Sequence, residues 1–442
     1  MLVLRGLWII ILVGLMTAAL AQVELEFWFE GPSEQVAFME EAAAEYNELQ
    51  DNAVINVERT PPGRERVATA LAAGQGPDLL WYNHNVPWFF GVEAIHPLNE
   101  FVLDPEIGID AERLFPAARQ AVHFGGVVMA VPIFHFPGVL IYNRDIFEAH
   151  GLGDEDAPAT WAEVQELAIQ LTEREGDTVT QWGLVTVTLD WMLQEILLSN
   201  GGDWVNEDLT QYVTCPDCLI EGLEWWHDLV HVHEVMPMPR GVTWVGAPHL
   251  QAGHEAFIRG EAAMTGYAAE IEAGIHLAAS ILNENPDLNL GAVLSPLGPS
   301  SGGERTISPG YSGLHVMADA ADHREGYLFI KWFFEEKALD FVRTMPGAVP
   351  STTAALEEPA LLEDPLVGRV IEDMLVAHLR NFHVFPGRLD VRAEEPGTAE
   401  SVLLGRADAR EAVENFLNHA ERVFQLYDED LTEFREAHEI VW

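Results

Sequence analysis

The chain is poor in positive charge. Its 442 residues include 23 Lys and Arg against 71 Asp and Glu, which gives a formal net charge of −48 at pH 7. Only Lys331 and Lys337 are lysines. Nucleic acid is excluded as an expected partner, because neutralising its phosphates requires Lys and Arg. The balance also argues against an anionic membrane surface or a strongly anionic ligand, unless arginines cluster locally.

Two interpretations of the acidic excess are open. One is a GC-rich genome combined with selection for solubility. The other is adaptation to high salt, where a dense carboxylate surface keeps the protein hydrated and its self-repulsion is screened. The second interpretation predicts that the melting temperature rises with NaCl well beyond about 0.15 M.

Recognisable catalytic motifs are also scarce. The sequence has no His-Glu-x-x-His and no Gly-rich phosphate loop followed by Lys. A glycosidase needs two carboxyl groups at a defined separation across a sugar bond, but most acids of so anionic a chain are expected at the solvated surface. We therefore expect no enzymatic activity and no metal or organic cofactor.

Long apolar runs are absent except at the N-terminus. Arg5 precedes an apolar run over residues 7–15, and Ala19-Leu20-Ala21 forms an A-x-A cleavage site before Gln22. Residues 1–21 are therefore predicted to be a signal peptide cleaved after Ala21. The alternative is a retained transmembrane anchor, but the run is near the lower length limit of a membrane span. No Cys stands at the cleavage point, so we expect no lipid anchor.

Strand and helix patterns alternate after this segment. Residues 23–29 alternate as a strand does, residues 34–49 place apolar side chains at helical spacing, and residues 54–58 predict a second strand. Residues 66–73 predict a helix that two glycines then stop. This order predicts a parallel βαβ unit.

The most informative stretch runs from Val131 to Thr172. The strand-like run Gly138–Asn143 is followed by a short helix, a loop rich in Gly, Asp and Pro, and a helix start at Thr160. Glu163 lies three residues further on, as a capping box requires. This order of parts resembles the extracellular solute-binding proteins of ABC sugar importers, bacterial family 1, which are maltose-binding-protein-like.

The resemblance continues in the expected order from about residue 23 to residue 352. The other segments that carry it are Ala73–Leu80, Asn200–Asp203, Phe257–Met264, Tyr311–Leu314 and Met345–Pro350. The last ninety residues match only as a helical tail. Together these matches are far more specific than any one of them alone.

The resemblance implies an α/β fold of two lobes, periplasmic-binding-protein-like, with a hinged interlobe cleft. Both lobes would be discontinuous, with an N-terminal lobe of 22–133 and 313–350 and a C-terminal lobe of 138–308 and 355–442. The implied hinge crossings lie near 134–137, 309–312 and 351–354.

The resemblance also implies a function. The chain would be a periplasmic receptor that captures a mono- or oligosaccharide by lobe closure and delivers it to the transmembrane subunits of an ABC permease. We expect a monomer. Another small polar solute, such as a glycerol-phosphate or a polyamine, is the alternative ligand, and a non-transport interaction module is a remote alternative.

A sugar site needs aromatic rings for stacking and carboxylate, amide or Arg groups for hydrogen bonds. In α/β lobes these groups are expected on loops at the carboxyl ends of strands. With the family's pattern, this criterion selects nine candidate ligand-binding residues: Glu30, Tyr82, His84, Asn85, His135, Asp190, Trp191, Glu270 and Tyr311.

Each candidate also has a structural interpretation. Glu30 and Glu270 are otherwise solvated acids, and Trp191 is otherwise a core residue. Strand alternation places Trp81 on the opposite face from Tyr82, so Tyr82 is the better candidate of that pair. Asp78 is expected to brace its own turn rather than to bind a ligand.

Cys215 and Cys218 are the only cysteines. In an oxidising compartment they are predicted to form a local disulfide that pins a loop to the following helix. A thioredoxin-like redox role is disfavoured, because the motif does not open the helix of that fold. Zinc binding with His227 is disfavoured too, because nine helical residues span about 13 Å and zinc ligands must all lie within ~2.3 Å of the metal.

Overall fold

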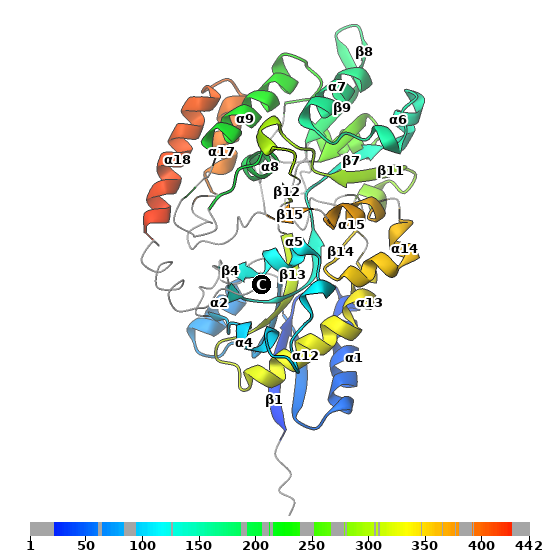
Figure 1. The fold of residues 1–442 in the computed structure, drawn as a ribbon. Helices are drawn as coiled ribbons and strands as arrows, with labels where there is room; N and C mark the ends of the chain where they lie inside the picture. Colours follow the sequence, from blue (N-terminus) through cyan, green and yellow to red (C-terminus); the bar gives the residue numbers. More distant parts are fainter. Residues whose placement is uncertain are drawn as a thin grey trace, which may run out of the picture.

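The computed structural model describes most of the chain between residues 22 and 426. The described residues are 22–60, 64–83, 94–124, 127–186, 192–205, 212, 215–238, 252–266, 278, 281–304, 306–307, 310–345, 347–364, 366–375, 377–379, 391 and 393–426. Two separate α/β units, each built around its own sheet, form the lower and upper parts of the molecule in Figure 1. The predicted mixed α/β, two-lobed class is confirmed.

A six-stranded mixed sheet organises the first unit. In spatial order its strands are β14 (Val349–Pro350), β6 (Val131–Phe136), β13 (Gly310–Val316), β3 (Leu79–Asn83), β1 (Val23–Phe29) and β2 (Ala53–Arg59). β1 pairs in parallel with β2 and β3, whereas β13 runs antiparallel to β3 and β6. The predicted parallel βαβ unit is confirmed.

Several helices pack around this first sheet. They include α1 (Ser33–Leu49), α2 (Arg64–Ala72), α12 (His323–Glu336) and α13 (Ala338–Arg343). α1 buries Val36, Met39, Ala43 and Tyr46, which are the apolar positions that its helical spacing predicts. Gly74 ends the α2 region with a positive φ of 64°, a conformation that glycine adopts without steric strain.

A five-stranded sheet organises the second unit. In spatial order its strands are β11 (Leu290–Leu294), β7 (Val139–Asn143), β10 (Ala262–Gly266), β9 (Thr178–Thr186) and β8 (Glu173–Glu175). β9 and β10 are parallel, and β7 runs antiparallel to β10 and β11. Its helices are α6 (Arg144–Ala149), α7 (Trp161–Leu171), α8 (Met192–Ser199), α9 (Pro216–His231), α10 (Ala252–Ile258), α17 (Glu395–Leu403) and α18 (Ala409–Gln425).

The chain passes between the sheets at three places. It leaves β6 and enters β7 across Pro137 and Gly138, it returns from β11 to β13, and it leaves the first sheet again after β14. Between β14 and the last helices lie α14 (Pro359–Leu362) and α15 (Gly368–Met374), and α15 contacts both β14 and β11. The late helices α17 and α18 pack against α9 in the second unit.

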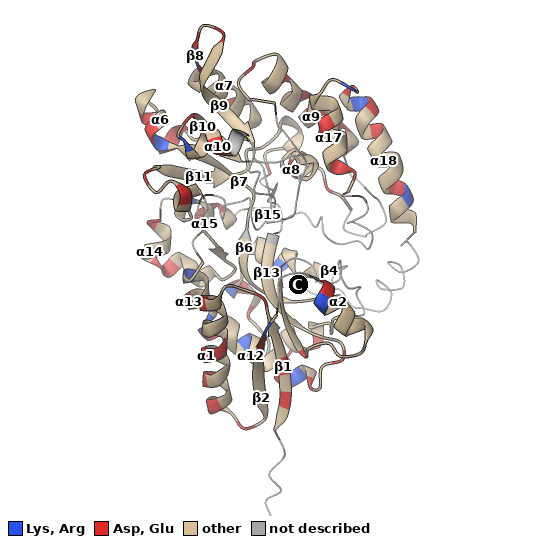
Figure 2. Cartoon of the chain, turned by 180° about the vertical axis from the view of Figure 1, so that it is seen from behind, with Lys and Arg blue, Asp and Glu red and all other residues tan. Residues whose placement is uncertain are grey.

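Short elements complete the description. They are α4 (Asn99–Val102), α5 (Pro116–Ala121), β4 (His123–Phe124), β5 (Val127–Val128), β12 (Thr306–Ile307) and β15 (His378–Leu379), with 3-10 turns η2 (Ala111–Arg113), η3 (Asp154–Asp156), η4 (Pro299–Ser301) and η5 (Thr353–Glu357). Among the described residues, no helix is both long enough and apolar enough to cross a membrane. The red segments of the ribbon in Figure 2 mark Asp and Glu positions on both units, including helices α1 and α18.

The capping box predicted at the start of α7 is present. The backbone N–H of Glu163 donates to Thr160 Oγ1 at 3.3 Å, and the Glu163 carboxylate accepts from the Thr160 N–H at 3.0 Å. Both bonds satisfy N–H groups that a helix start otherwise leaves unpaired. Trp161, the first residue of α7, is 3% exposed, as its predicted core position requires.

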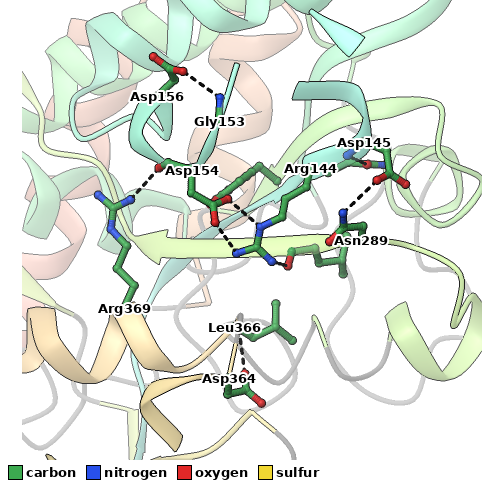
Figure 3. A network of polar contacts seen from close by, with 12 residues as sticks. Arg144, Asp145, Gly153, Asp154, Asp156, Asn289, Asp364, Leu366 and Arg369 are labelled. Atoms are coloured by element: carbon green, nitrogen blue, oxygen red, sulfur yellow. Dashed lines mark hydrogen bonds and ion pairs between the residues drawn. The ribbon is translucent and has the colours of Figure 1, made fainter. Parts of the chain in front are cut away.

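A polar network joins the start of α6 to its surroundings (Figure 3). Arg144 makes a two-pronged contact with the Asp154 carboxylate, at 2.7 Å from Nε and 3.0 Å from an Nη, and it also donates to the Leu290 carbonyl. The Tyr142 hydroxyl donates to the same carboxylate at 2.8 Å, and Arg369 of α15 donates to the Asp154 carbonyl. The network therefore ties β7, β11, η3 and α15 together.

Candidate functional site

The carboxyl ends of β1 and β3 lie at the edge of the first sheet where the chain crosses to the second. Near the end of β3, Asn83 pairs with Ser312 of β13, and Ser312 pairs in turn with Phe134 of β6, just before the crossing. Glu30 follows β1 and Tyr82 lies near the end of β3, and these two strands are parallel neighbours. The described candidates of this unit therefore share one edge.

Strand alternation separates Trp81 from Tyr82 as predicted. Trp81 is 4% exposed and packs in the aromatic core of the first unit, with its ring centroid 5.3 Å from that of Phe29. Tyr82 is half-buried and belongs to the other side of the sheet. The side chains of Trp81 and Tyr82 therefore lie on opposite faces of the sheet.

His135 and Tyr311 face each other across β6 and β13. They are paired in register, and their ring centroids are 6.4 Å apart. Tyr311 is 0% exposed and His135 is 1% exposed, so in this conformation both lie beneath the surface at the crossing. Burial raises the pKa of Tyr311 well above its usual range, so its hydroxyl stays protonated and able to donate a hydrogen bond.

The remaining five candidates, His84, Asn85, Asp190, Trp191 and Glu270, lie outside the described residues. The described strands that precede them end on the crossing side of their sheets. In the second sheet Thr186 pairs with Gly266, the last residues of β9 and β10, and Gly266 pairs with Leu140, two residues after Gly138 in the connection from β6 to β7. Both sheets therefore present their relevant strand ends toward the crossing.

Comparison with known proteins decides the family. A model of the family described as bacterial extracellular solute-binding protein matches residues 31–339. The chain belongs to this family. It is a solute-binding receptor of the two-lobed kind and not an enzyme.

Individual relatives agree with this assignment. The chain is 27% identical to an arabinooligosaccharide-binding protein of Halalkalibacterium halodurans, over 77% of this chain and 74% of that protein. A shorter match, 25% identical over 35% of this chain and 36% of the relative, is to a periplasmic sn-glycerol-3-phosphate-binding protein of Salmonella typhimurium. The solved structure of the sugar-binding protein MalE from Xanthomonas citri has the same fold, with a TM-score of 0.73 at 17% identity, covering 94% of this chain and 99% of that one.

In this solute-binding protein, one buried carboxyl at the crossing escaped the sequence analysis. Glu195 of α8 is 2% exposed, and its Oε2 has no hydrogen-bond partner among the residues that the structure describes. A Cβ placed on Gly138 would lie 2.8 Å and 2.9 Å from the two carboxylate oxygens and 2.9 Å from Ser295 Oγ. The carboxyl therefore fills the space beside two crossing segments, and a larger residue at position 138 would have to displace the Glu195 and Ser295 side chains.

Burial of Glu195 changes its acidity. The loss of solvation raises the pKa of Glu195 to about 7, although the Ser295 hydroxyl partly offsets this effect. The only signal in the sequence is the pair Gln194-Glu195 inside the otherwise apolar helix MLQEILLS. A polar residue in an apolar helix does not by itself indicate a buried carboxyl site, because the sequence does not show which residues lie near it in the folded protein.

Asp78 has the structural role expected of it, but it reaches further than its own turn. Its carboxylate accepts from the Glu26 N–H at 2.7 Å and from the Ala321 N–H at 2.6 Å. It thereby joins the start of β3 to β1 and to the segment after β13. A carboxylate saturated by two backbone donors is a brace of the fold.

The cysteines form the predicted disulfide in the structure, with a Cα–Cα distance of 5.3 Å. Helix α9 begins at Pro216, so the two cysteines stand at the start of this helix. The His231 Nε2–H donates to the Leu403 carbonyl, 2.7 Å away. No group of three or more His, Cys, Asp or Glu able to hold a metal occurs within the described part of the chain.

One pattern with the spacing Gly-x-Ser-x-Gly, Gly298–Gly302, is not a nucleophile elbow. It forms the 3-10 turn η4 rather than a strand-to-helix turn. The Ser300 hydroxyl donates to Glu221 at 2.8 Å, and its N–H donates to the Asn200 side chain. These bonds tie η4 to the ends of α8 and α9, which is a structural role.

Proposed function

We propose that this receptor captures a mono- or oligosaccharide between its two lobes and delivers it to the membrane permease of an ABC importer. The observation that supports the proposal is that Glu30 and Tyr82 lie at the carboxyl ends of neighbouring parallel strands of the first sheet, on the side where the chain crosses to the second sheet. Ligands of open α/β sheets bind outside the carboxyl ends of strands. The names of the oligosaccharide-binding relative and the MalE neighbour support a carbohydrate.

The lobes of this proposal are 22–133 with 313–350, and 138–308 with 355–442. The hinge crossings lie near 134–137, 309–312 and 351–354. A ligand that contacts both lobes only when they are closed stabilises the closed form by that difference in affinity. The mechanism is thus a shift of the equilibrium between the open and the closed form, with no covalent change in the ligand.

Each proposed ligand residue has a role that its chemistry allows. Trp191, Tyr82 and Tyr311 supply rings for stacking or phenol hydroxyls, and Glu30, Asp190 and Glu270 supply carboxylates for sugar hydroxyls. His84, Asn85 and His135 supply further hydrogen-bonding groups. Tyr311 and His135 are buried in the described conformation, so in that conformation they lie beneath the surface that a ligand would contact.

The proposal includes a location and a partner. Residues 1–21 act as a signal peptide removed after Ala21, and the chain reaches the periplasm without a lipid anchor. The closed, loaded monomer then docks on the transmembrane subunits of the permease. Carbohydrate, rather than protein or nucleic acid, is the cargo.

A glycerol-phosphate is the second candidate ligand. It is favoured by the shorter match to the glycerol-3-phosphate-binding protein, but the net charge of −48 opposes an anionic cargo. A polyamine is a cation, so the negative net charge favours it, but no other observation does. An interaction module outside transport predicts no response to any small solute.

The test is thermal melting of purified protein with mono- to tetrasaccharides, and with glycerol-phosphates and polyamines, at low and high salt. A ligand at a hundredfold excess over its Kd adds about 2.7 kcal/mol to the free energy of unfolding. For a chain of this size, that stabilisation raises the melting temperature by roughly 2–4 °C. A shift with a sugar supports the proposal. A shift with only a glycerol-phosphate or a polyamine overturns the carbohydrate assignment, and no shift with demonstrably ligand-free protein removes the support for a sugar.

Two variants of equal charge make the test specific. Glu30→Gln is expected to weaken the ligand-induced shift, because it removes a carboxylate acceptor at the proposed edge. Glu48→Gln alters an exposed acid on α1 and is expected to leave the shift unchanged. Equal behaviour of the two variants would remove Glu30 from the proposed site.

A further inference from the structure

We propose that Cys215 and Cys218 form a reversible thiol–disulfide site that exchanges with an external dithiol. The pair lies in the second-sheet unit, at the junction of α8 and α9, and its role is separate from ligand capture. The inference rests on where the two sulfurs lie, which of them solvent reaches, and what the reduced pair would contact.

The first observation is the position of the pair at a helix start. Cys215 is the N-cap residue of the 16-residue helix α9, Pro216 is its first residue, and Cys218 lies in its first turn. The free N–H groups and the dipole at a helix N-terminus stabilise a thiolate and lower the pKa of its thiol. The nearby Asp217 carboxylate is 87% exposed and lies 3.9 Å from Arg410, so its opposing charge is solvated and partly paired.

The second observation is an asymmetry of exposure. Cys218 is 1% exposed, whereas Cys215 is half-buried and is followed by the exposed Pro216 and Asp217. Of the two residues only Cys215 has appreciable exposed surface, so the attack of an external thiolate is assigned to its sulfur rather than to that of Cys218. A disulfide with one accessible sulfur at a helix start has the features of an exchanging pair rather than an inert one.

The third observation is a partner for the reduced form. Cys218 Sγ lies 3.1 Å from the carbonyl oxygen of Asn200, at the end of α8, and the Asn200 side chain donates to the Cys218 carbonyl at 3.2 Å. A disulfide sulfur carries no proton, but a Cys218 thiol formed in place has this carbonyl as its acceptor. The reduced pair is thus accommodated without moving the backbone.

The small ring is consistent with this role. The two cysteines are only three positions apart in the sequence, and closing so short a loop removes little entropy from the unfolded chain. The disulfide therefore adds little to folding stability, and its opening leaves the fold intact.

The exchange balances as a two-electron transfer. An external thiolate attacks Cys215 Sγ, the S–S bond breaks, and Cys218 leaves as a thiolate that takes up a proton. The second thiol of the external dithiol then attacks the mixed disulfide and releases Cys215. The external dithiol is oxidised to its disulfide, and Cys215 and Cys218 end as two thiols.

The experiment exposes the folded protein to glutathione redox buffers at neutral pH, blocks free thiols by alkylation, and counts them by intact mass. We expect reduction by millimolar reduced glutathione without denaturant, and reoxidation by glutathione disulfide. A pair that stays oxidised until the protein is unfolded would overturn the proposal.

Two matched variants test the accessible sulfur. Cys218→Ser leaves Cys215 alone and is expected to form a mixed disulfide with glutathione on the order of tenfold faster than Cys215→Ser, which leaves the buried Cys218. Circular dichroism and melting curves establish that both are folded. Equal rates in two folded variants would contradict the proposed asymmetry and overturn the site.

Discussion

The two units of the molecule are stabilised by different chemistry around sheets of similar size. In the first-sheet unit, aromatic rings meet across the core, and the ring of Phe341 lies 5.2 Å from Trp81, 5.3 Å from Phe38 and 6.0 Å from Phe29. In the second-sheet unit aromatic rings also pack, as Trp161 does on Trp225 at 4.9 Å, but this unit adds a buried carboxyl, Glu195, and a partly exposed charged pair, Arg144 with Asp154. Ring packing does not depend on pH or salt, whereas carboxyl contacts do.

This difference predicts which unit responds to solution conditions. Between about pH 5 and pH 8, a change in pH acts on the second unit through Glu195, because burial raises the pKa of this carboxyl to about 7. The variants below either remove the feature that defines one unit or change a feature that both units share.

The largest expected effect comes from breaking the aromatic core. Phe341→Ala removes a fully buried ring that contacts four other aromatic rings, so we expect a loss of about 3–5 kcal/mol in the free energy of unfolding. Chemical denaturation followed by circular dichroism measures it. Leu103→Ala, in the same unit but at a side chain that is 55% exposed, is the control and should change little. A loss below about 1 kcal/mol for Phe341→Ala would show that the cavity collapses, contrary to this account.

The next effect comes from neutralising the buried carboxyl of the second unit. The pKa of Glu195 is raised from 4.5 to about 7, so its contribution to stability is fully present below the unfolded pKa and is lost as the pH rises through about 7. Glu195→Gln removes this dependence. We expect the variant to be more stable than the parent near pH 8, by at most about 3 kcal/mol, and to have no such advantage near pH 5.

Melting curves across this pH range measure the effect. The stability difference between Glu195→Gln and the parent should grow between about pH 5 and pH 8. Parallel curves for the two proteins would mean that Glu195 keeps the same charge throughout, and the described burial would then not govern its titration.

Much of the fold could be predicted because its helices and strands depend on residues that are close together in the sequence. The strands at 23–29 and 54–58, the intervening helix and the capping box at Thr160 each depend on neighbours within a few residues. The opposite facing of Trp81 and Tyr82 follows from strand alternation alone. The order of family motifs then supplied the two-lobed arrangement that periodicity cannot give.

The candidate site was less predictable, because it depends on contacts between distant segments. Glu195, Gly138 and Ser295 are far apart in the sequence, and their meeting at the crossing is a consequence of three separate chain passages. The reach of Asp78 to the Ala321 N–H spans 243 positions. The nine predicted ligand residues remain predictions, five of them outside the described residues.

A smaller effect is expected from the charged network of the second unit. Arg144→Gln removes the two-pronged contact with Asp154 (Figure 3) and the bond to the Leu290 carbonyl. We expect a loss of about 1–2 kcal/mol, limited because the Asp154 side chain is 56% exposed and water replaces the lost partner. The Arg144 guanidinium holds the pKa of Asp154 below its usual range, so the difference from the parent should shrink as the pH falls through that lowered pKa.

The control for Arg144 is an exposed pair in the first unit. Arg324 contacts Glu325 at 3.4 Å with 55% of its side chain exposed, and Arg324→Gln should change the stability by less than about 0.5 kcal/mol. Urea denaturation at low and high salt measures both variants. Equal losses would show that the network of Figure 3 is no stronger than an ordinary surface pair.

The smallest effect concerns helix caps, which both units share. Thr160→Ala in the second unit and Asp322→Ala in the first each remove a side-chain acceptor for a backbone N–H, that of Glu163 and that of Glu325. Each should lower the free energy of unfolding by about 1 kcal/mol, with Asp322 slightly above Thr160 because its charge also interacts with the helix dipole. Near-equal losses measured side by side would show that the units differ in their cores and not in their local backbone signals. A loss well above about 2 kcal/mol for Thr160→Ala alone would instead mean that the start of α7, with Trp161 packed beneath it, is part of what distinguishes the second unit.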